Sequence, residues 1–394
     1  MDERFHIEVN CQQINHDGEK ICGDVFLSRR IKEEGRILTV LSDGMGHGVK
    51  ANVLATLTAT MAINFTEEHK DVQVIADIIM NTLPVCSERK ISYSTFTIVD
   101  IEADGETRIL EYDNPQCVIL RGNKPFDPNW DYLTLESERN KGKEIRSCRF
   151  YPRLGDRIVF MSDGVAQSGM GSDKFPFGWE RDNVQDYILG LLDNEPAMSA
   201  SRLAAKVVNY AHINDRYTSK DDTSCGVIYF RQPRKMLIVT GPPFEESADR
   251  EYGDIVRNFE GKKILCGATT ADIVARELKQ TIEDTFDFDD PDLPPVSYMP
   301  GVDLITEGIL TLSKVHDILK SYNNNTRLGK GPADRIVKML LESDEISFVI
   351  GTKINIAHQD PNLPVELEIR RTVVKRVARV LEDKFLKEVT LRFI

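Results

Sequence analysis

Long apolar runs are missing from this sequence of 394 residues. The longest uncharged stretch of marked apolar character, residues 53–65, is rich in threonine and far shorter than the roughly 20 residues that cross a bilayer. The first residues are acidic where a signal peptide has a basic segment followed by an apolar one. We therefore expect no membrane anchor and no export signal, and we expect the protein in the cytoplasm.

Paired cysteines and excess basic charge are also missing. The seven cysteines are scattered, and no two have the spacing of a zinc knuckle or a redox pair, so reduced thiols are the simplest interpretation. The 50 Lys and Arg are outnumbered by 63 Asp and Glu, which gives a net charge of -13. This charge repels nucleic acid and anionic lipid. We expect neither nucleic acid nor a membrane as a partner.

What remains is the composition of an ordinary globular protein, with 41% hydrophobic and 29% charged residues. The chain is longer than the roughly 250 to 300 residues at which one core usually stops growing, which favours two domains. A boundary is expected near Gln232, because a proline follows the last strand of the first part and a new apolar strand begins at Met236. We predict a first domain over residues 1–232 and a second over residues 233–394.

The first domain is dominated by strand-like runs rich in Val, Ile, Phe and Thr. We expect strands at residues 5–11, 23–28, 36–41, 93–101, 107–112, 117–121, 157–161 and 225–230. Apolar residues spaced by three and four predict helices at residues 49–65, 72–83, 184–192 and 201–214. Antiparallel strands interrupted by pairs of helices predict an α/β (α+β) sandwich, in which helices cover sheets.

The second domain is predicted to be a smaller α/β domain. Strands are expected at residues 236–239 and 262–266, a helix at residues 271–282, and an acidic loop at residues 284–295. The turn containing Gly267 and Thr270 links a strand to a helix start, where free amides attract anions, and the turn after Thr240 could lie beside it. Two interpretations stay open: a pocket for a small anionic ligand, or a hydroxyl cap with a tight turn and no ligand.

The feature that carries chemistry is an aspartate at the end of an apolar strand. It occurs twice, at Asp43 in the sequence SDGMGHG and at Asp163 in the sequence SDGV. In both, the following glycine lets the backbone turn sharply and approach a ligand. Asp24 interrupts a predicted strand, where an aspartate is out of character, and Asp221-Asp222 comes directly before another strand.

Carboxylates gathered from such positions would repel one another unless cations lie between them. Ligands that are all oxygen favour hard cations such as Mn²⁺ or Mg²⁺ over zinc or copper. Two such ions would neutralise four carboxylates, and a water that bridges them loses a proton readily, which supplies a hydroxide nucleophile at neutral pH. The pattern therefore predicts a two-metal site that hydrolyses phosphoesters.

At these motifs the sequence resembles the PPM (type 2C) metal-dependent protein phosphatases, most closely the bacterial branch typified by stage II sporulation protein E. The motifs around Asp24, Asp43, Asp163 and Asp221 occur in the family's order over residues 5–230. The resemblance implies an αββα sandwich and hydrolysis of phosphoserine or phosphothreonine. It also implies a phosphoprotein substrate, with small anti-sigma-factor antagonists among the candidates.

The same resemblance implies a role for each residue of the site. Asp43 would bridge both metals, and Asp43 and Asp163 are the expected catalytic residues. Asp163 and Asp221 would complete one metal site, with Asp222 as the alternative to Asp221. Asp24 and the carbonyl of Gly44 would complete the other.

The general acid is left open by the sequence. Eukaryotic members carry a histidine two residues after the bridging aspartate, whereas this chain has Met45 there and His47 two positions later. We interpret His47 as a residue that caps or precedes the helix, and Asp222 as a solvated or capping carboxylate. Residues 166–179, with their glycines and aromatics, are either a mobile flap over the metals or an ordinary loop.

Two other functions compete with the phosphatase. One is a weakly active, phosphatase-like signalling scaffold or sensor that binds partners, and the other is a nonspecific phosphodiesterase. We expect the second domain to be regulatory, sensing a ligand or partner and biasing the flap. The oligomeric state is left open, with a homodimer among the alternatives.

Overall fold

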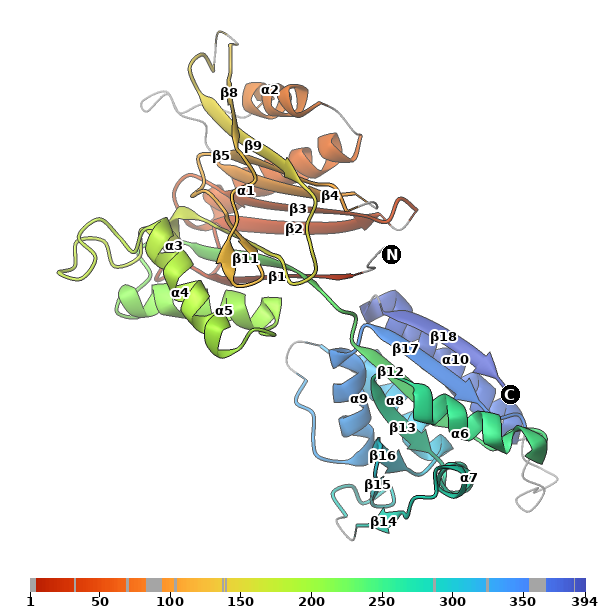
Figure 1. The fold of residues 1–394 in the computed structure, drawn as a ribbon. Coiled ribbons are helices and arrows are strands. Elements are labelled where there is room, and N and C mark those ends of the chain that lie inside the picture. Colours follow the sequence, from red (N-terminus) through yellow and green to blue (C-terminus); the bar gives the residue numbers. More distant parts are fainter. Residues whose placement is uncertain are drawn as a thin grey trace. The chain divides into compact units, whose positions relative to one another are not determined.

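The computed structural model describes residues 5–31, 33–68, 71–82, 94–102, 105–136, 138, 140–285, 288–323, 326–353, 366–385 and 387–394. The chain divides into two compact units, Met1–Gln232 and Pro233–Ile394, and each is described by itself (Figure 1). Among these described residues, no helix is both long enough and apolar enough to cross a bilayer.

The first unit contains two antiparallel sheets with helices on their outer faces (Figure 1). One sheet has the order β2 (Asp24–Ile31), β3 (Arg36–Asp43), β4 (Phe96–Ile101), β5 (Thr107–Tyr112), β9 (Glu144–Phe150) and β8 (Asp131–Thr134). The other has the order β1 (His6–Ile14), β11 (Thr223–Arg231), β10 (Arg157–Met161), β6 (Val118–Arg121) and β7 (Lys124–Pro125). The helices are α1 (Gly48–Glu67), α2 (Val72–Thr82), α3 (Asp163–Ala166), α4 (Arg181–Asn194) and α5 (Ala200–Asn214).

Alternating side chains of the strands build three apolar layers. On β3, Leu41 points into the layer between the sheets, which also holds Phe160 and Ile228. Its neighbour Val40 points to the opposite face, into the layer that α1 covers with residues such as Ile63. A third layer lies between the second sheet and helices α4 and α5. The predicted αββα sandwich is confirmed.

The structure corrects several details of the predicted elements. Asp24 is the first residue of β2 and does not interrupt a strand. Strands β8 and β9 were not expected, because β9 carries basic residues between its buried Ile145 and Phe150 and so lacks a continuous apolar run. Residue 93 of the predicted strand 93–101 and residue 83 of the predicted helix 72–83 lie outside the described residues.

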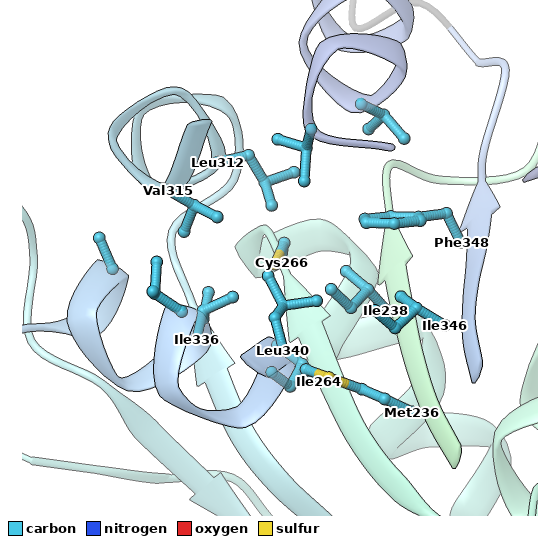
Figure 2. Packing of buried hydrophobic residues seen from close by; sticks show 14 of the residues in the cluster. Met236, Ile238, Ile264, Cys266, Leu312, Val315, Ile336, Leu340, Ile346 and Phe348 are labelled. Atoms are coloured by element: carbon cyan, nitrogen blue, oxygen red, sulfur yellow. The ribbon is translucent and has the colours of Figure 1, made fainter. Parts of the chain in front are cut away.

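The second unit is a seven-stranded sheet with helices on both faces, which confirms the predicted smaller α/β domain. Its order is β14 (Glu283–Asp284), β15 (Ser297–Met299), β16 (Val302–Thr306), β13 (Lys262–Cys266), β12 (Lys235–Thr240), β17 (Glu345–Ile350) and β18 (Glu388–Phe393). The helices are α6 (Asp249–Asn258), α7 (Ala268–Leu278), α8 (Ile309–Ser321), α9 (Pro332–Glu342) and α10 (Glu366–Phe385). Helices α8, α9 and α10 cover one face, where Ile336, Leu340 and Phe348 pack together (Figure 2), and α6 and α7 cover the other.

Five strands of this sheet, β16, β13, β12, β17 and β18, are parallel. Numbered in chain order, they lie in the order 3-2-1-4-5, which is a doubly wound arrangement that starts at its centre with β12. Ligands of such sheets bind in the crevice outside the carboxyl ends of the strands. Only residues 232–234 separate β11 from β12. Each of these two strands lies between two neighbouring strands of its own sheet.

A buried ion pair braces the first sheet against α1. The guanidinium of Arg36 donates to both carboxylate oxygens of Asp100 on β4, at 2.8 and 2.9 Å, and to the carbonyl oxygen of Thr66 on α1 at 2.7 Å. Both charged side chains are almost fully buried. Removing one partner of such a pair leaves an uncompensated charge in the interior.

Replacing Arg36 by alanine should therefore lower the free energy of unfolding of the first unit by about 3 to 5 kcal/mol. Both tryptophans, Trp130 and Trp179, lie in this unit, so urea titration followed by tryptophan fluorescence reports on it selectively. The control is Arg30→Ala on the neighbouring strand, whose exposed side chain should contribute less than about 0.5 kcal/mol. Equal losses in both variants would contradict the prediction.

Glu111 on β5 is a buried carboxyl group that makes stability depend on pH. Its Oε1 accepts a hydrogen bond from the Cys117 amide at 2.9 Å, and Arg146 lies 3.4 Å from its Oε2. Burial nevertheless raises the pKa of Glu111 to about 7, against about 4.3 in an unfolded chain. Between these values the folded state holds a proton that the unfolded state releases, so stability falls as the pH rises.

We expect Glu111→Gln to remove this contribution. As the pH rises from about 4 to about 8, the free energy of unfolding of the wild type should fall relative to the variant by about 3 kcal/mol. Urea titrations with tryptophan fluorescence at several pH values measure the difference. A difference that stays constant across the window would show that Glu111 is not protonated in the folded state.

Candidate functional site

Two aspartates of the first sheet face each other across one strand pair. Asp24 opens β2 and Asp43 closes β3, and the register of the two strands sets them opposite each other. Asp24 is only 2% exposed. Its Oδ2 accepts a hydrogen bond from the Ser224 hydroxyl at 2.6 Å, whereas its Oδ1 has no hydrogen-bond partner among the described residues.

The second sheet supplies two further aspartates. Strands β10 and β11 pair antiparallel. The end of β10 therefore lies beside the start of β11. Asp163 comes just after the end of β10, and Asp221 comes just before the start of β11. The Ser162 amide donates to the Ser224 carbonyl oxygen at 3.1 Å and holds the two segments together. A side chain at Gly164 would collide with the carbonyl of Asp222, so this approach requires glycine.

These four carboxyl groups interact electrostatically although they come from two sheets. The pKa of Asp43 is raised well above its usual range, first by burial and then by Asp24, Asp163 and Asp221. Burial also raises the pKa of Asp24 to about 7, partly offset by the Ser224 hydrogen bond. The pKa of Asp221 rises to about 6 through burial and the neighbouring Asp163. The structure thus brings Asp24, Asp43, Asp163 and Asp221 into one acidic cluster.

The turn after Asp43 is fixed by its glycine and by serine hydroxyls. A side chain at Gly44 would collide with the backbone of Ala51, so α1 can approach the turn only at glycine. The Ser94 hydroxyl donates to the Asp43 carbonyl oxygen at 2.8 Å and lies 2.7 Å from the Ser42 hydroxyl. The backbone on both sides of Asp43 is therefore held from the neighbouring segment.

Asp222 does not have the solvated position that the sequence suggested. It is 2% exposed, and its Oδ1 accepts a hydrogen bond from the His16 amide at 2.9 Å, while its Oδ2 has no hydrogen-bond partner within the described ranges. The interpretation of Asp222 as a solvated carboxylate is wrong. Its carboxylate is buried and caps a backbone amide instead. The amide comes from a loop about 200 residues earlier in the chain, which local sequence could not reveal.

His47 directly precedes a helix, as one of its two predicted roles requires. The helix is α1, and the His47 side chain makes no capping hydrogen bond to it. Its Nδ1 lies 2.7 Å from Glu19 Oε1, and its ring stacks on His16 with the centroids 4.2 Å apart. His16 in turn is an electrostatic neighbour of Asp221. A pair of imidazoles therefore lies beside the acidic cluster, and nothing in the sequence singled out His16.

Asp113 is a further carboxylate that sequence reasoning missed. It follows β5 directly, and its pKa is raised by burial and by the neighbouring Asp163. The signal was present, because Asp113 follows an apolar strand in the same way as Asp43 and Asp163.

Within the described part of the chain, no three His, Cys, Asp or Glu side chains are arranged so that they could hold one metal ion as they stand. The cluster does offer oxygen donors. Asp24 Oδ1, Asp163 Oδ1 and Asp222 Oδ2 are buried without a hydrogen-bond partner among these residues. Buried carboxylate oxygens of this kind suit a hard divalent cation.

The fold has counterparts among solved structures. The PP2C phosphatase domain of SpoIIE from Bacillus subtilis, with a fragment of its regulatory domain, is 16% identical with a TM-score of 0.47, over 58% of this chain and 64% of that chain. The RsbU and RsbW domains of a Mycobacterium tuberculosis protein are 16% identical with a TM-score of 0.45, over 64% and 68%. The catalytic domain of the serine/threonine phosphatase PstP, solved with two manganese ions, is 15% identical with a TM-score of 0.37, over 58% and 100%.

Two further comparisons concern sequence. No curated protein matches this chain. The family described as Stage II sporulation protein E (SpoIIE) matches residues 33–231, which is just over half of the chain and includes Asp43, Asp163 and Asp221. The chain belongs to the stage II sporulation protein E family.

Proposed function

We propose that the first unit is a metal-dependent protein phosphatase that hydrolyses phosphoserine or phosphothreonine. The observation that carries the proposal is the acidic cluster, in which strand ends of two sheets hold Asp24, Asp43, Asp163 and Asp221. Burial, together with repulsion from neighbouring aspartates, raises the pKa values of Asp24, Asp43 and Asp221. Family membership agrees with this chemistry. A perturbed set of carboxyl groups is typical of functional sites.

The proposed ligands of the metals are Asp24, Asp43, the carbonyl of Gly44, Asp163 and Asp221. Mg²⁺ keeps several of its waters and binds one or two carboxylates, so two ions shared among these groups do not need three side chains around one point. Asp222 is the alternative to Asp221, and its buried Oδ2 supports that alternative. Bound there, two Mn²⁺ or Mg²⁺ ions would supply an activated water and stabilise the charge that develops on the phosphoryl group.

The chain's own residues position this chemistry. Ser94 and Ser42 fix the backbone at Asp43, and the Ser162 hydroxyl accepts a hydrogen bond from the Ser224 amide at 3.0 Å, which fixes the turn at Asp163. Ligands supported on strand ends lose little freedom when an ion binds. His16, an electrostatic neighbour of Asp221, and the His47 ring stacked on it are the side chains that we propose as candidates for protonating the leaving group.

We propose a phosphoprotein as the substrate, with a small anti-sigma-factor antagonist as the candidate that family resemblance suggests. The cytoplasm is the proposed location. A phosphatase-like scaffold that binds partners without turnover is the second candidate. It differs from the enzyme in one measurable respect, because it would bind metal without hydrolysing phosphoester.

Asp43→Asn should reduce phosphatase kcat/KM by at least about a hundredfold, the size of effect seen when one charge-stabilising group is removed from an active site. Release of phosphate from a phosphoserine peptide, assayed with Mn²⁺ and with a chelator, measures the loss. The matched control is Asp186→Asn on the exposed side of α4, which should keep full activity.

A second readout separates metal binding from turnover. Mn²⁺ should raise the thermal stability of the wild type and of Asp186→Asn but not that of Asp43→Asn, because a ligand that binds only the folded state stabilises it. Unchanged turnover in Asp43→Asn would refute the metal mechanism. Stabilisation by Mn²⁺ without any hydrolysis in the wild type would favour the scaffold.

We also propose that residues 233–394 regulate the first unit. The support is architectural, because the second unit has its own core and its own doubly wound sheet. Removing residues 233–394 should change kcat/KM by at least about fivefold, the lower end of typical coupling between sites. Comparison of the truncated and full chains in the same assay tests this. Equal activity would count against a regulatory role.

A further inference from the structure

A pocket of about 970 Å³ lies at the carboxyl ends of the parallel strands in the second unit. Thr240 at the end of β12, Cys266 at the end of β13 and Thr306 at the end of β16 all line it. This is the edge at which doubly wound sheets bind their ligands. The volume is that of a site for a small molecule.

Helix α7 points its first turn into this pocket. Ala268, Thr269 and Thr270 line it, and the preceding Gly267 has a φ of 113°, which favours glycine. The amides of a first helical turn have no partner within the helix. The N-cap residue of α7, Gly267, makes no side-chain capping hydrogen bond, and no acidic residue lies in the first turn of this helix. The predicted hydroxyl cap at this turn is therefore wrong.

Helix α8, which starts at the same edge, is different. The carboxylate of Glu307 accepts a hydrogen bond from the Thr311 amide at 3.2 Å and so caps that helix from within the chain. Of the two helices, α7 is therefore the one whose first-turn amides, at the positive end of the helix dipole, face the pocket.

Two buried hydroxyls point to a ligand independently of the helix. Thr240 and Thr270 are each 1% exposed and both line the pocket. Neither Oγ1 has a hydrogen-bond partner among the residues that the structure describes. A buried hydroxyl without a partner costs free energy, and native proteins leave few of them. Both are explained if a bound molecule accepts their hydrogen bonds.

The charged side chains that line the pocket are of both signs, with four acidic residues and three basic ones, Arg276, Lys353 and Arg370. Arg370 is only 6% exposed, lines the pocket and approaches so close to Gly241 that a side chain there would collide with it. The acidic side chains of the lining are engaged with neighbours, through the pairs Glu246 with Lys353, Asp249 with Arg276, Asp284 with Ser297 and Glu307 with Thr311. Each of the four acidic side chains thus has a partner of its own within the described residues, and the first-turn amides of α7 are not among those partners.

We infer that this pocket binds a small molecule that carries a phosphate group. The phosphate accepts hydrogen bonds from the first-turn amides of α7 and from the hydroxyls of Thr240 and Thr270. Several donors at a helix start match the oxygens of a phosphate. The pocket is larger than phosphate alone requires, so an organic group of nucleotide size fits beside it. The inference concerns the second unit and does not depend on the proposed phosphatase.

The test uses the full chain with a chelator present, so that no metal-dependent site contributes. Isothermal titration calorimetry at constant ionic strength is carried out with inorganic phosphate, with AMP and with adenosine. We expect saturable binding of AMP and of phosphate, mutual competition between them, and no binding of adenosine. Thr270→Val and Thr240→Val should each weaken AMP binding by about tenfold or more, as the loss of a hydrogen bond to a charged group does.

Three controls keep the outcome interpretable. Thr390→Val makes the same change at an exposed position of β18, outside the pocket, and should bind as the wild type does. Asp43→Asn should also bind normally, which separates this site from the first unit. Thr270→Val should be at least as stable as the wild type, because the hydroxyl it removes has no partner among the described residues.

Three results would overturn the inference. One is the lack of saturable binding of both phosphate and AMP up to about 10 mM, which corresponds to less than about 3 kcal/mol of binding free energy. Another is binding that survives unchanged in both threonine variants, which would place the anion elsewhere. Binding of adenosine as tight as that of AMP would show that phosphate is not what the pocket recognises.

Discussion

Repulsion among carboxylates is the constraint around which the first unit is organised. Asp24 and Asp43 come from one sheet and Asp163 and Asp221 from strand ends of the other, and burial raises the pKa values of Asp24, Asp43 and Asp221. Only a rigid frame can hold such groups together. Two antiparallel sheets packed through a shared apolar layer provide it, because each aspartate is attached to a strand end that cannot shift without breaking a ladder of hydrogen bonds.

The candidate sites of the two units are built from different chemical groups. In the first, side-chain carboxylates at strand ends form the candidate site, and small residues and serines hold the turns that carry them. In the second, backbone amides at the start of α7 and two threonine hydroxyls form it, at the edge where parallel strands end. We propose cations as the ligands of the first arrangement and infer an anion for the second, in a chain whose net charge is -13.

The sequence predicts those parts of both units that depend on neighbouring residues. The runs of apolar residues and the glycines after them predict β3, β10 and the aspartates at the ends of these strands. The family resemblance predicts the αββα sandwich, which the structure confirms. What fails depends on distant segments. The burial of Asp222 requires a loop from the start of the chain, and the stacking of His47 requires His16. The 3-2-1-4-5 strand order, and hence the pocket beside Thr270, follows from long-range pairing that no local pattern encodes.

The connection between the units has a mechanical consequence. Strand β11 is followed after residues 232–234 by β12, and each of these strands is bonded on both sides within its own sheet. Next to the tether, Arg231 pairs with His6 of β1 and Lys235 pairs with Glu345 of β17, and Pro233 restricts the backbone between them. An extended chain spans at most about 3.3 to 3.6 Å per residue, so this short segment limits how far apart the two strand ends can lie.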